Sequence, residues 1–147
     1  MAKSRENPYL QFNFTVDLGD GVAAGFQECS NIGMEVTVAE YRDGNYPLNN
    51  VRKFTGLNKA ADITLKRGVI GDLSLFTWLK GTREGTFDPR TVTVSLLDEA
   101  RSPVCSWILQ QAQPTKWVGP TLTAKGGGQV AVEELHLVAE RIDFQST

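Results

Sequence analysis

Residues 10–18 read Leu-Gln-Phe-Asn-Phe-Thr-Val-Asp-Leu, and this stretch decides the fold class. Apolar and polar side chains alternate along it without an error, which is the period of a β-strand with one apolar and one polar face. The turn sequence Gly19-Asp20-Gly21 follows, and a second strand is predicted from Val22 to Cys29. Together the two strands are predicted to form a hairpin.

The rest of the chain continues as short alternating segments. Residues 130–144 are predicted to form one long final strand, and its apolar phase shifts between Val132 and Leu135, which indicates a bulge or a change of contact surface. Residues 114–120 are predicted to be irregular, residues 121–124 to be short and extended, and the triple glycine at 126–128 to be a hinge. Further strands are predicted at Met34–Tyr41, Ala61–Arg67, Arg90–Leu97 and Val104–Gln111.

One segment, Gly71–Lys80, changes to a helical period with a broad apolar stripe. Asp72 can cap its start, and Gly81 is expected to end it. The total of about seven strands and one helix predicts a mainly β fold, an antiparallel β-barrel or sandwich with one flanking α-helix. Because the chain shows no internal repeat and no linker, residues 1–147 are predicted to form a single domain.

Residues 42–59 do not fit this pattern. They follow neither a helical nor a strand period, and glycine, proline and asparagine interrupt them repeatedly. Irregular segments of this length are uncommon inside a compact domain and are usually functional or disordered. Disorder is disfavoured because the segment carries aromatic and branched apolar side chains. We therefore expect an extended arm that packs on something other than its own domain. Residues 1–9 form a second, polar arm, which is expected to be held loosely unless a partner fixes it.

The composition excludes several classes of function. The chain has 147 residues, of which 41% are hydrophobic and 22% charged, as is ordinary for a soluble globular protein. A net charge of −2 gives no basic footprint for nucleic acid or an anionic membrane. No apolar run approaches the roughly 20 residues of a membrane span, and the N-terminus lacks a signal core, so we expect cytoplasmic synthesis with no signal peptide and no membrane anchor. Cys29 and Cys105 are expected to be reduced thiols.

No catalytic, metal or cofactor site is predicted. His136 is the only histidine and lies on the polar phase of a strand, where a structural or interface role is favoured. With one histidine and separated cysteines, a zinc site would need an unusual set of carboxylates. Cys29 has no histidine nearby in sequence, and the neighbouring Glu28 would raise its pKa. Glu133 and Glu134 are adjacent in a strand, so their carboxylates should point to opposite faces.

Other motifs also favour structural interpretations. The triple glycine lacks the Lys-Ser/Thr and the helix of a phosphate loop, and Gly19-Asp20-Gly21 lacks the further acidic ligands of a calcium loop. The basic pairs Arg52-Lys53 and Lys66-Arg67 suit a partner's carboxylates better than phosphate. The three tryptophans are expected to pack in the core or in an interface, because no basic groove accompanies them.

Five segments carry a resemblance to a known family through their order and spacing. They are residues 7–14, the kinked strand end at 25–32, the arm residues 52–56 with the strand and helix that follow, residues 107–120, and residues 130–140. They span nearly the whole chain. As an ordered set they resemble the tail tube proteins of contractile-tailed phages and of extracellular contractile injection systems, and the secreted tube protein of type VI secretion systems is similar.

The resemblance implies a fold and a function. Family members are small β-barrels or sandwiches flanked by a helix, and six subunits close into a ring whose sheets join into one continuous inner barrel. Rings stack into a hollow tube inside a contractile sheath, whose contraction drives the tube through a target envelope, and the lumen carries DNA or protein cargo. The implied partners are further copies of the chain, the sheath protein, baseplate, spike and tube-initiator proteins, and a terminator cap. The protein is expected in a phage tail or a phage-tail-like particle.

The physical chemistry of the sequence agrees with a structural subunit. Strands that join those of neighbouring copies leave no free sheet edge, and a head-to-tail contact that closes gives a ring. The alternative is a monomeric β-barrel that binds a ligand inside, and an enzyme on a β scaffold is disfavoured by the residue inventory. We expect the arm to be buried between subunits. The predicted inter-subunit residues are Tyr46, Leu48, Val51, Arg52, Lys53, Phe54 and Leu57 of the arm, with Asn7 and Tyr9 near the N-terminus.

Overall fold

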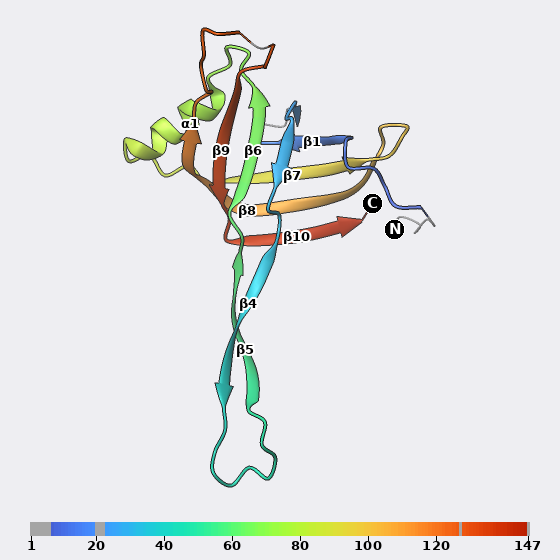
Figure 1. Ribbon diagram of the computed structural model, residues 1–147, viewed down its shortest axis with the longest axis vertical. Helices are drawn as coiled ribbons and strands as arrows, with labels where there is room; N and C mark the ends of the chain where they lie inside the picture. The colour runs from blue at the N-terminus through green and yellow to red at the C-terminus, as the bar shows by residue number, and fades with distance from the viewer. Residues whose placement is uncertain (1–6, 20–22, 127, 147) are drawn as a thin grey trace.

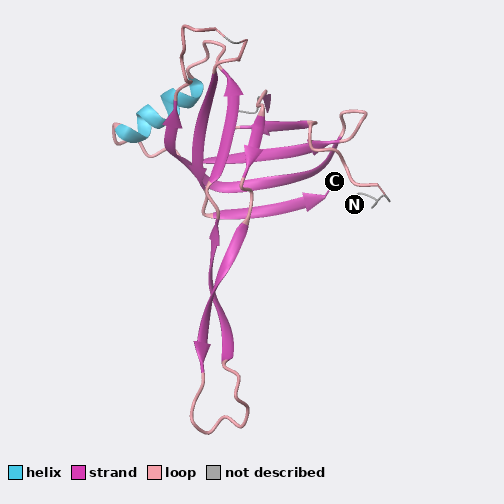
Figure 2. Cartoon of the chain, in the orientation of Figure 1, coloured by secondary structure: helices cyan, strands magenta, loops and turns pink. Residues whose placement is uncertain are grey.

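The structure, a computed structural model, describes residues 7–19, 23–126 and 128–146. Within these ranges it has ten β-strands and one α-helix (Figures 1 and 2). Most of the predicted turn at 19–21 falls outside the described residues, as do Val22, Gly127 and residues 1–6 of the N-terminal arm. The elements are β1 Phe14–Asp17, β2 Ala23–Ala24, β3 Glu28–Ser30, β4 Met34–Tyr41, β5 Arg52–Ala60, β6 Ile63–Gly68, α1 Ser74–Arg83, β7 Arg90–Leu97, β8 Pro103–Val118, β9 Val132–Val138 and β10 Arg141–Ser146.

Strand β8 is the centre of the main sheet, in which all strand pairs are antiparallel. Its first part pairs with β7 and β10, and its second part, residues 113–118, pairs with β9. The strand bends near Gln111, which has a φ of 54°, so the two parts of the sheet run in different directions (Figure 1). We call β2, β1, β7, the first part of β8 and β10 sheet A, and we call the second part of β8, β9, β6 and β3 sheet B.

The two sheets and α1 enclose one apolar core. Alternate residues of β9 are buried, as expected for a strand with one face against a core, and in β6 Ile63, Leu65 and Arg67 are buried in one phase together with Thr64. The predicted mainly β fold with one flanking helix is confirmed, as a sandwich whose sheet does not close into a barrel within one chain. The buried core residues are Val16, Leu18, Ile63, Leu65, Leu75, Trp78, Val92, Val94, Leu109, Ala112, Leu135, Leu137 and Ile142.

Helix α1 occupies the predicted region but is shifted toward the C-terminus. The Asp72 carboxylate accepts a hydrogen bond of 3.0 Å from the Ser74 N–H at its first residue. This bond is the main cause of a lowered pKa of Asp72. The predicted stop at Gly81 is wrong, because the helix continues to Arg83. Gly85 follows with a φ of 91°, and this left-handed conformation ends the helix at low steric cost.

The predicted long final strand is two strands that follow one edge of β8. The pairs Gln113–Val138 and Gln110–Arg141 keep a continuous register around the bend. The Glu140 N–H, between the two strands, donates to the Gln110 carbonyl oxygen at 3.0 Å. The prediction that residues 114–120 are irregular is wrong for residues 114–118, because these residues belong to β8.

The predicted bulge between Val132 and Leu135 is also wrong. The register of β9 with β6 is regular there, and Glu133 is buried in the same phase as Leu135. The apolar pattern shifts in the sequence because a charged residue occupies an inward position. The register irregularity lies instead on β8, between Pro114 and Lys116.

The first predicted hairpin is confirmed only near its turn. β1 covers residues 14–17 of the predicted strand, and two of its residues pair with β2. β3, which overlaps the end of the predicted second strand, pairs with β6 in sheet B instead. Leu10 and Phe12 are more than half exposed, so the start of the alternating stretch does not face the core. Residues 121–124, predicted to be extended, lie outside the strands.

Candidate assembly interface

Strands β4 and β5 form a two-stranded hairpin that projects from the body (Figure 1). Their side chains are exposed on both faces, and only Ala60, at the base, is half-buried. The predicted strand at Met34–Tyr41 is confirmed, whereas the prediction of an irregular arm is wrong for residues 52–59, which belong to β5. Only residues 42–51, which we call the tip loop, lie between the two strands. A period of two arises when one face of a strand is buried, and neither face of this hairpin is buried in the single chain.

A β-bulge interrupts the middle of the hairpin. Val36 pairs with Asn58 and Val38 with Thr55, so two residues of β5 oppose the single residue Thr37 of β4. One of the two is Gly56, where an added Cβ would lie 3.0 Å from the Thr37 Oγ1 atom. The bulge displaces the side-chain phase of β5, which is a second reason why its sequence shows no regular alternation.

Exposed apolar side chains cover the hairpin along its length. Leu57 at the bulge is 84% exposed, and the others are between 38% and 57% exposed. Large contiguous apolar surfaces of this kind mark interaction sites in soluble proteins. The large exposed apolar residues of the hairpin are Met34, Val36, Val38, Tyr41, Leu48, Val51, Phe54 and Leu57.

The tip loop is ordered by its own polar contacts. The Arg42 guanidinium donates from Nε to the Leu48 carbonyl oxygen at 3.1 Å and from Nη2 to the Tyr46 carbonyl oxygen at 3.2 Å. The Asp43 carbonyl oxygen accepts from the Tyr46 N–H at 3.2 Å. Arg52 lies over the Tyr46 ring, with its guanidinium carbon 4.5 Å from the ring centroid. These contacts hold the tip in one shape without help from the body.

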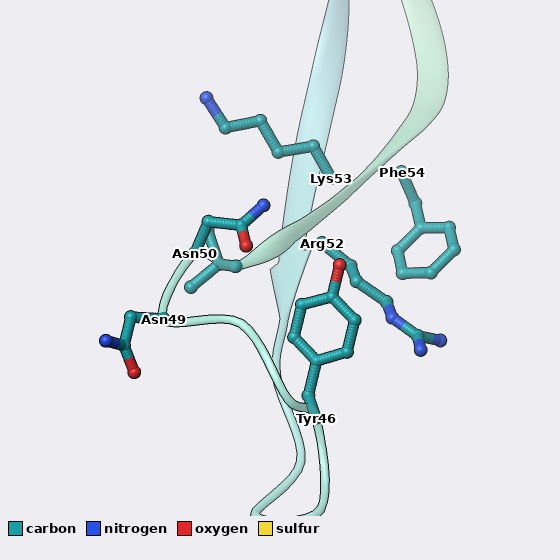
Figure 3. Close-up of a pocket in the computed structure, with 7 residues that line it drawn as sticks. Tyr46, Asn49, Asn50, Arg52, Lys53 and Phe54 are labelled. Carbon is teal, nitrogen blue, oxygen red and sulfur yellow. The ribbon is translucent and has the colours of Figure 1, made fainter.

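Figure 3 shows how the side chains divide at the tip. Arg52, Phe54 and Tyr46 lie on one side of the hairpin, and Lys53 points to the other. Lys53 is the direct cross-strand neighbour of Glu40. Opposite charges in such a position support the pairing of the two strands. The tip therefore offers an aromatic and cationic face and a separate polar face.

The structure brings together seven of the nine predicted interface residues, since all seven arm residues lie on this one hairpin. Asn7 and Tyr9 lie elsewhere, on the N-terminal segment, and Tyr9 lines a groove on the body with Phe12 and Phe26. Sequence reasoning missed the apolar residues of β4, because alternating apolar residues normally indicate a buried face. It also missed Arg42, whose role depends on the fold of the tip loop.

Sheet B has two edges with no strand beside them in the part of the chain that the structure describes. β3 pairs there only with β6, and residues 113–118 of β8 pair only with β9. Because successive pairs in sheet B are antiparallel, β3 and β8 run in opposite directions. Unpaired edges present free N–H and C=O groups and are ready to pair with another chain.

The face of sheet B that points away from the core is polar. Lys66 lies between two carboxylates, with its Nζ 3.4 Å from Glu28 Oε2 and 3.5 Å from Glu134 Oε1. The hydrogen bond to Glu28, with the charges of both carboxylates, raises the pKa of Lys66. His136 extends the network, with Nε2 3.3 Å from Glu134 Oε2 and Nδ1 3.2 Å from Thr64 Oγ1. The sequence favours a partner's carboxylate for Lys66, and within the single chain two carboxylates already lie beside it.

Inside sheet B, Glu133 and Arg67 form a buried ion pair. Arg67 Nε donates to Glu133 Oε1 at 2.7 Å, and Trp117 Nε1 donates to Glu133 Oε2 at 3.2 Å. The guanidinium also lies 3.6 Å from the Asp72 carboxylate, so the pair ties the start of α1 to the sheet. The predicted opposite orientation of Glu133 and Glu134 is confirmed.

The remaining candidate groups are the two cysteines and the side chains that could hold a metal ion. Burial, with a smaller contribution from the Glu28 charge, raises the pKa of Cys29 to about 12, which makes its thiol a poor nucleophile near neutral pH. Cys29 and Cys105 are free thiols. Among the described residues, no cluster of three or more His, Cys, Asp or Glu side chains is arranged to hold a metal ion. In the same part of the chain, no helix has the length and apolar character to cross a membrane.

Comparison with protein families identifies this architecture. The family model of the T4-like virus tail tube protein gp19 matches residues 10–143. The chain belongs to this family. The tail tube protein is thus a structural component of a tube, as the resemblance in the sequence implied, and the family does not favour a monomeric ligand-binding module. No curated protein matches this chain.

Several solved structures are similar to the tail tube protein. The tube terminating cap of the anti-feeding prophage is 28% identical, with 99% of this chain and 95% of that chain covered and a TM-score of 0.87. A chain of the sheath-tube complex of PVC, an extracellular contractile injection system in its extended state, is 29% identical, with coverages of 97% and 94% and a TM-score of 0.86. A chain of the six-fold symmetrised anti-feeding prophage baseplate shares the fold at 22% identity, with coverages of 97% and 98% and a TM-score of 0.84.

Proposed function

We propose that this tail tube protein is a subunit of the inner tube of a contractile injection system or phage tail, in which hexameric rings stack into a hollow tube. The observation that carries the proposal is the β4–β5 hairpin, which is long, ordered and apolar, yet exposed on both faces. Exposed apolar patches mark surfaces that bind another protein, and a second copy of the chain would cover this one. The similarity to a sheath-tube complex and to a six-fold baseplate supports the particle type and the ring size.

Ring closure takes place through the free edges of sheet B. The β3 edge of one subunit pairs with residues 113–118 of β8 in the next, and this joint is antiparallel because the two strands run in opposite directions. The contact is heterologous, so it repeats around the ring until the ring closes. Closure removes the exposed edges that would otherwise promote irregular aggregation.

The tube wall places the polar face of sheet B toward the lumen. Its other face is covered by the core and cannot be exposed without unfolding the subunit. Lys66, Glu28, Glu134 and His136 then line the channel through which DNA or protein cargo passes. The charges of Lys66, Glu28 and Glu134 partly cancel on this wall and leave an excess of one negative charge when all three are ionised.

Ring stacking uses the hairpin, which continues from sheet B and projects beyond the body (Figure 1). The seven predicted residues Tyr46, Leu48, Val51, Arg52, Lys53, Phe54 and Leu57 are buried against an adjacent ring. Asn7 and Tyr9 contribute to a contact between neighbouring subunits. The finished tube is enclosed by a sheath protein, begins on baseplate, spike and tube-initiator proteins, and ends at a terminator cap. The assembled particle is a phage tail or a phage-tail-like injection particle.

Electron microscopy of the purified protein, alone and co-expressed with tube-initiating partners, tests this proposal. Wild-type protein should give rings or tubes of uniform diameter. Deletion of residues 44–56 should leave a folded β-domain by circular dichroism that forms no tubes. A wild-type protein that stays monomeric under all these conditions, or a deletion variant that assembles normally, would refute the proposal.

Charge reversal provides a finer test. Arg52→Glu or Lys53→Glu should shorten tubes and lower their resistance to salt, because each replaces a cation at the stacking contact with an anion. Arg83→Glu is the matched control, since Arg83 is also exposed but lies at the far end of α1. Equal tube length and salt resistance in all three variants would remove the proposed role of the two hairpin cations.

A further inference from the structure

The end of the subunit opposite the hairpin has a defined place in the fold. β6 begins next to the base of the hairpin and ends at Gly68, which pairs with Val132 at the start of β9. β8 ends at the same edge, where Val118 pairs with Glu134. The loop residues 69–73, 119–126 and 128–131 therefore lie at the far end of sheet B from the hairpin (Figure 1).

This far end carries the second group of exposed apolar side chains. Leu122 is 81% exposed, Ile70 79% and Val130 76%, although surface loops are normally polar. Val69 and Leu73 in the same loops are also exposed. The far end and the hairpin together hold most of the large exposed apolar residues in the described part of the chain.

A groove lies beneath the 119–131 loop on the polar face of sheet B. It has a volume of about 590 Å³, and both apolar and charged side chains line it. Leu122, Val130 and Val132 form its apolar part. Glu28 and Glu134 are at its base, where they share the single cation of Lys66. The base of the groove therefore holds an excess of one negative charge when these three groups are ionised.

The hairpin tip has the opposite charge. Arg42, Arg52 and Lys53 outnumber the two acids Glu40 and Asp43, and the apolar residues of the tip lie beside them. The cationic, aromatic tip is thus complementary in both polarity and charge to the groove at the other end of the same chain. Stacked identical rings require this arrangement, because the lower surface of each subunit must fit the upper surface of another.

We propose that the far-end groove and the loop residues 69–73, 119–126 and 128–131 are the seat for the hairpin tip of a second copy of this chain in the adjacent ring. This inference rests on the proposed stacked tube and adds the residues that receive the hairpin. The apolar tip residues cover Ile70, Leu122 and Val130, and Arg52 or Lys53 approaches the carboxylates of Glu28 and Glu134.

Substitution of the seat tests the proposal. Leu122→Asp/Val130→Asp should leave rings intact and reduce tube elongation at least tenfold, because it places charges under the apolar tip. Both residues are exposed in the single chain, so the circular dichroism and unfolding temperature of the monomer should stay unchanged. Phe144→Asp is the matched control at an exposed aromatic of sheet A, and it should elongate normally.

Cross-linking identifies the occupant of the seat. A Leu48→Cys/Leu122→Cys variant, assembled into tubes and treated with a short bismaleimide, should give a ladder of covalent oligomers longer than six chains, because such links run from ring to ring. The single variants and Leu48→Cys/Phe144→Cys should give no such ladder. Wild-type protein is the control for Cys29 and Cys105.

The outcomes separate this inference from the proposed function. If wild-type protein forms no tube, the proposed function itself fails. If wild-type tubes form, but the Leu122→Asp/Val130→Asp variant elongates normally and the cysteine pair gives no ladder, the seat is wrong while the tube stands. If bare tubes of the aspartate variant are normal and only sheath attachment is lost, the seat belongs to the sheath and the inference is overturned.

Discussion

The buried ion pair between Arg67 and Glu133 allows a quantitative prediction. Glu133→Leu removes the acceptor at 2.7 Å and leaves the Arg67 guanidinium, which is only 4% exposed, without its main counter-charge. Breaking a buried pair in this way typically costs about 3–5 kcal/mol of unfolding free energy. Arg67 keeps the Asp72 carboxylate at 3.6 Å, so we expect a loss near the lower end, about 3 kcal/mol.

This loss should be easy to measure. For a chain of this size it corresponds to a fall in the unfolding temperature of roughly 10 °C. Urea unfolding at a protein concentration where the subunit is monomeric, followed by tryptophan fluorescence, gives the free energy directly. The matched control is Glu134→Leu on the opposite face of the same strand, whose half-exposed pair with Lys66 should be worth about 0–1 kcal/mol.

A double replacement distinguishes the ion pair from simple loss of packing. Arg67→Met/Glu133→Leu should recover most of the lost stability, because apolar residues of similar size often replace a buried pair at little cost. The reasoning is refuted if Glu133→Leu unfolds within about 1 kcal/mol of wild type, or if the double variant is no more stable than the single one.

Further predictions concern the hairpin and Cys29. Arg42→Ala should speed amide hydrogen exchange in the tip loop, because two carbonyl contacts are lost, while exchange in the body stays unchanged; uniform exchange rates would contradict the ordering role of Arg42. Gly56→Ala should reduce tube formation by forcing the Thr37 hydroxyl away from the bulge, and Thr37→Ala in the same chain should relieve the defect; no recovery would argue against this contact. Cys29 in the folded protein should react with iodoacetamide at pH 8 at least a hundredfold more slowly than in urea, since its raised pKa leaves little thiolate below about pH 12; equal rates would show that the thiol is not protected.

The sequence predicts the parts of the fold that depend on local patterns. The alternating residues of β4, β6 and β7 and the apolar stripe of α1 each give the right element. Gly81 misleads because a helix tolerates an internal glycine at a cost of about 1 kcal/mol when its other residues pack well. The shifted phase in β9 cannot be interpreted locally, because Glu133 is buried through a partner that lies 66 residues away in the chain.

The sequence places the predicted interface residues of the arm in one segment, but it does not predict that part of this segment forms a strand paired with β4. Its interface residues are adjacent in the sequence, so composition alone places them together, and the family resemblance implies a use for them. The strands of the hairpin are not evident, because within the described residues β4 and β5 pair only with each other and neither buries a face in the single chain. The bulge at Gly56 also shifts the side-chain phase of β5, so the sequence of this strand shows no period of two. The residues of the seat are separated in sequence, and only the common end of β6, β8 and β9 brings them together.

The separation of the hairpin from the core has a consequence for when the tube forms. No residue of β4 or β5 belongs to the buried core, so the body folds without creating or consuming the surface through which copies associate. If rings stack as proposed, a completed ring presents several seats at once, whereas two free subunits offer each other one, and simultaneous engagement raises the effective affinity. We therefore expect growth by nucleated polymerisation, with a lag and a critical concentration. Folded subunits can accumulate below the threshold for spontaneous nucleation until a template supplies the first ring.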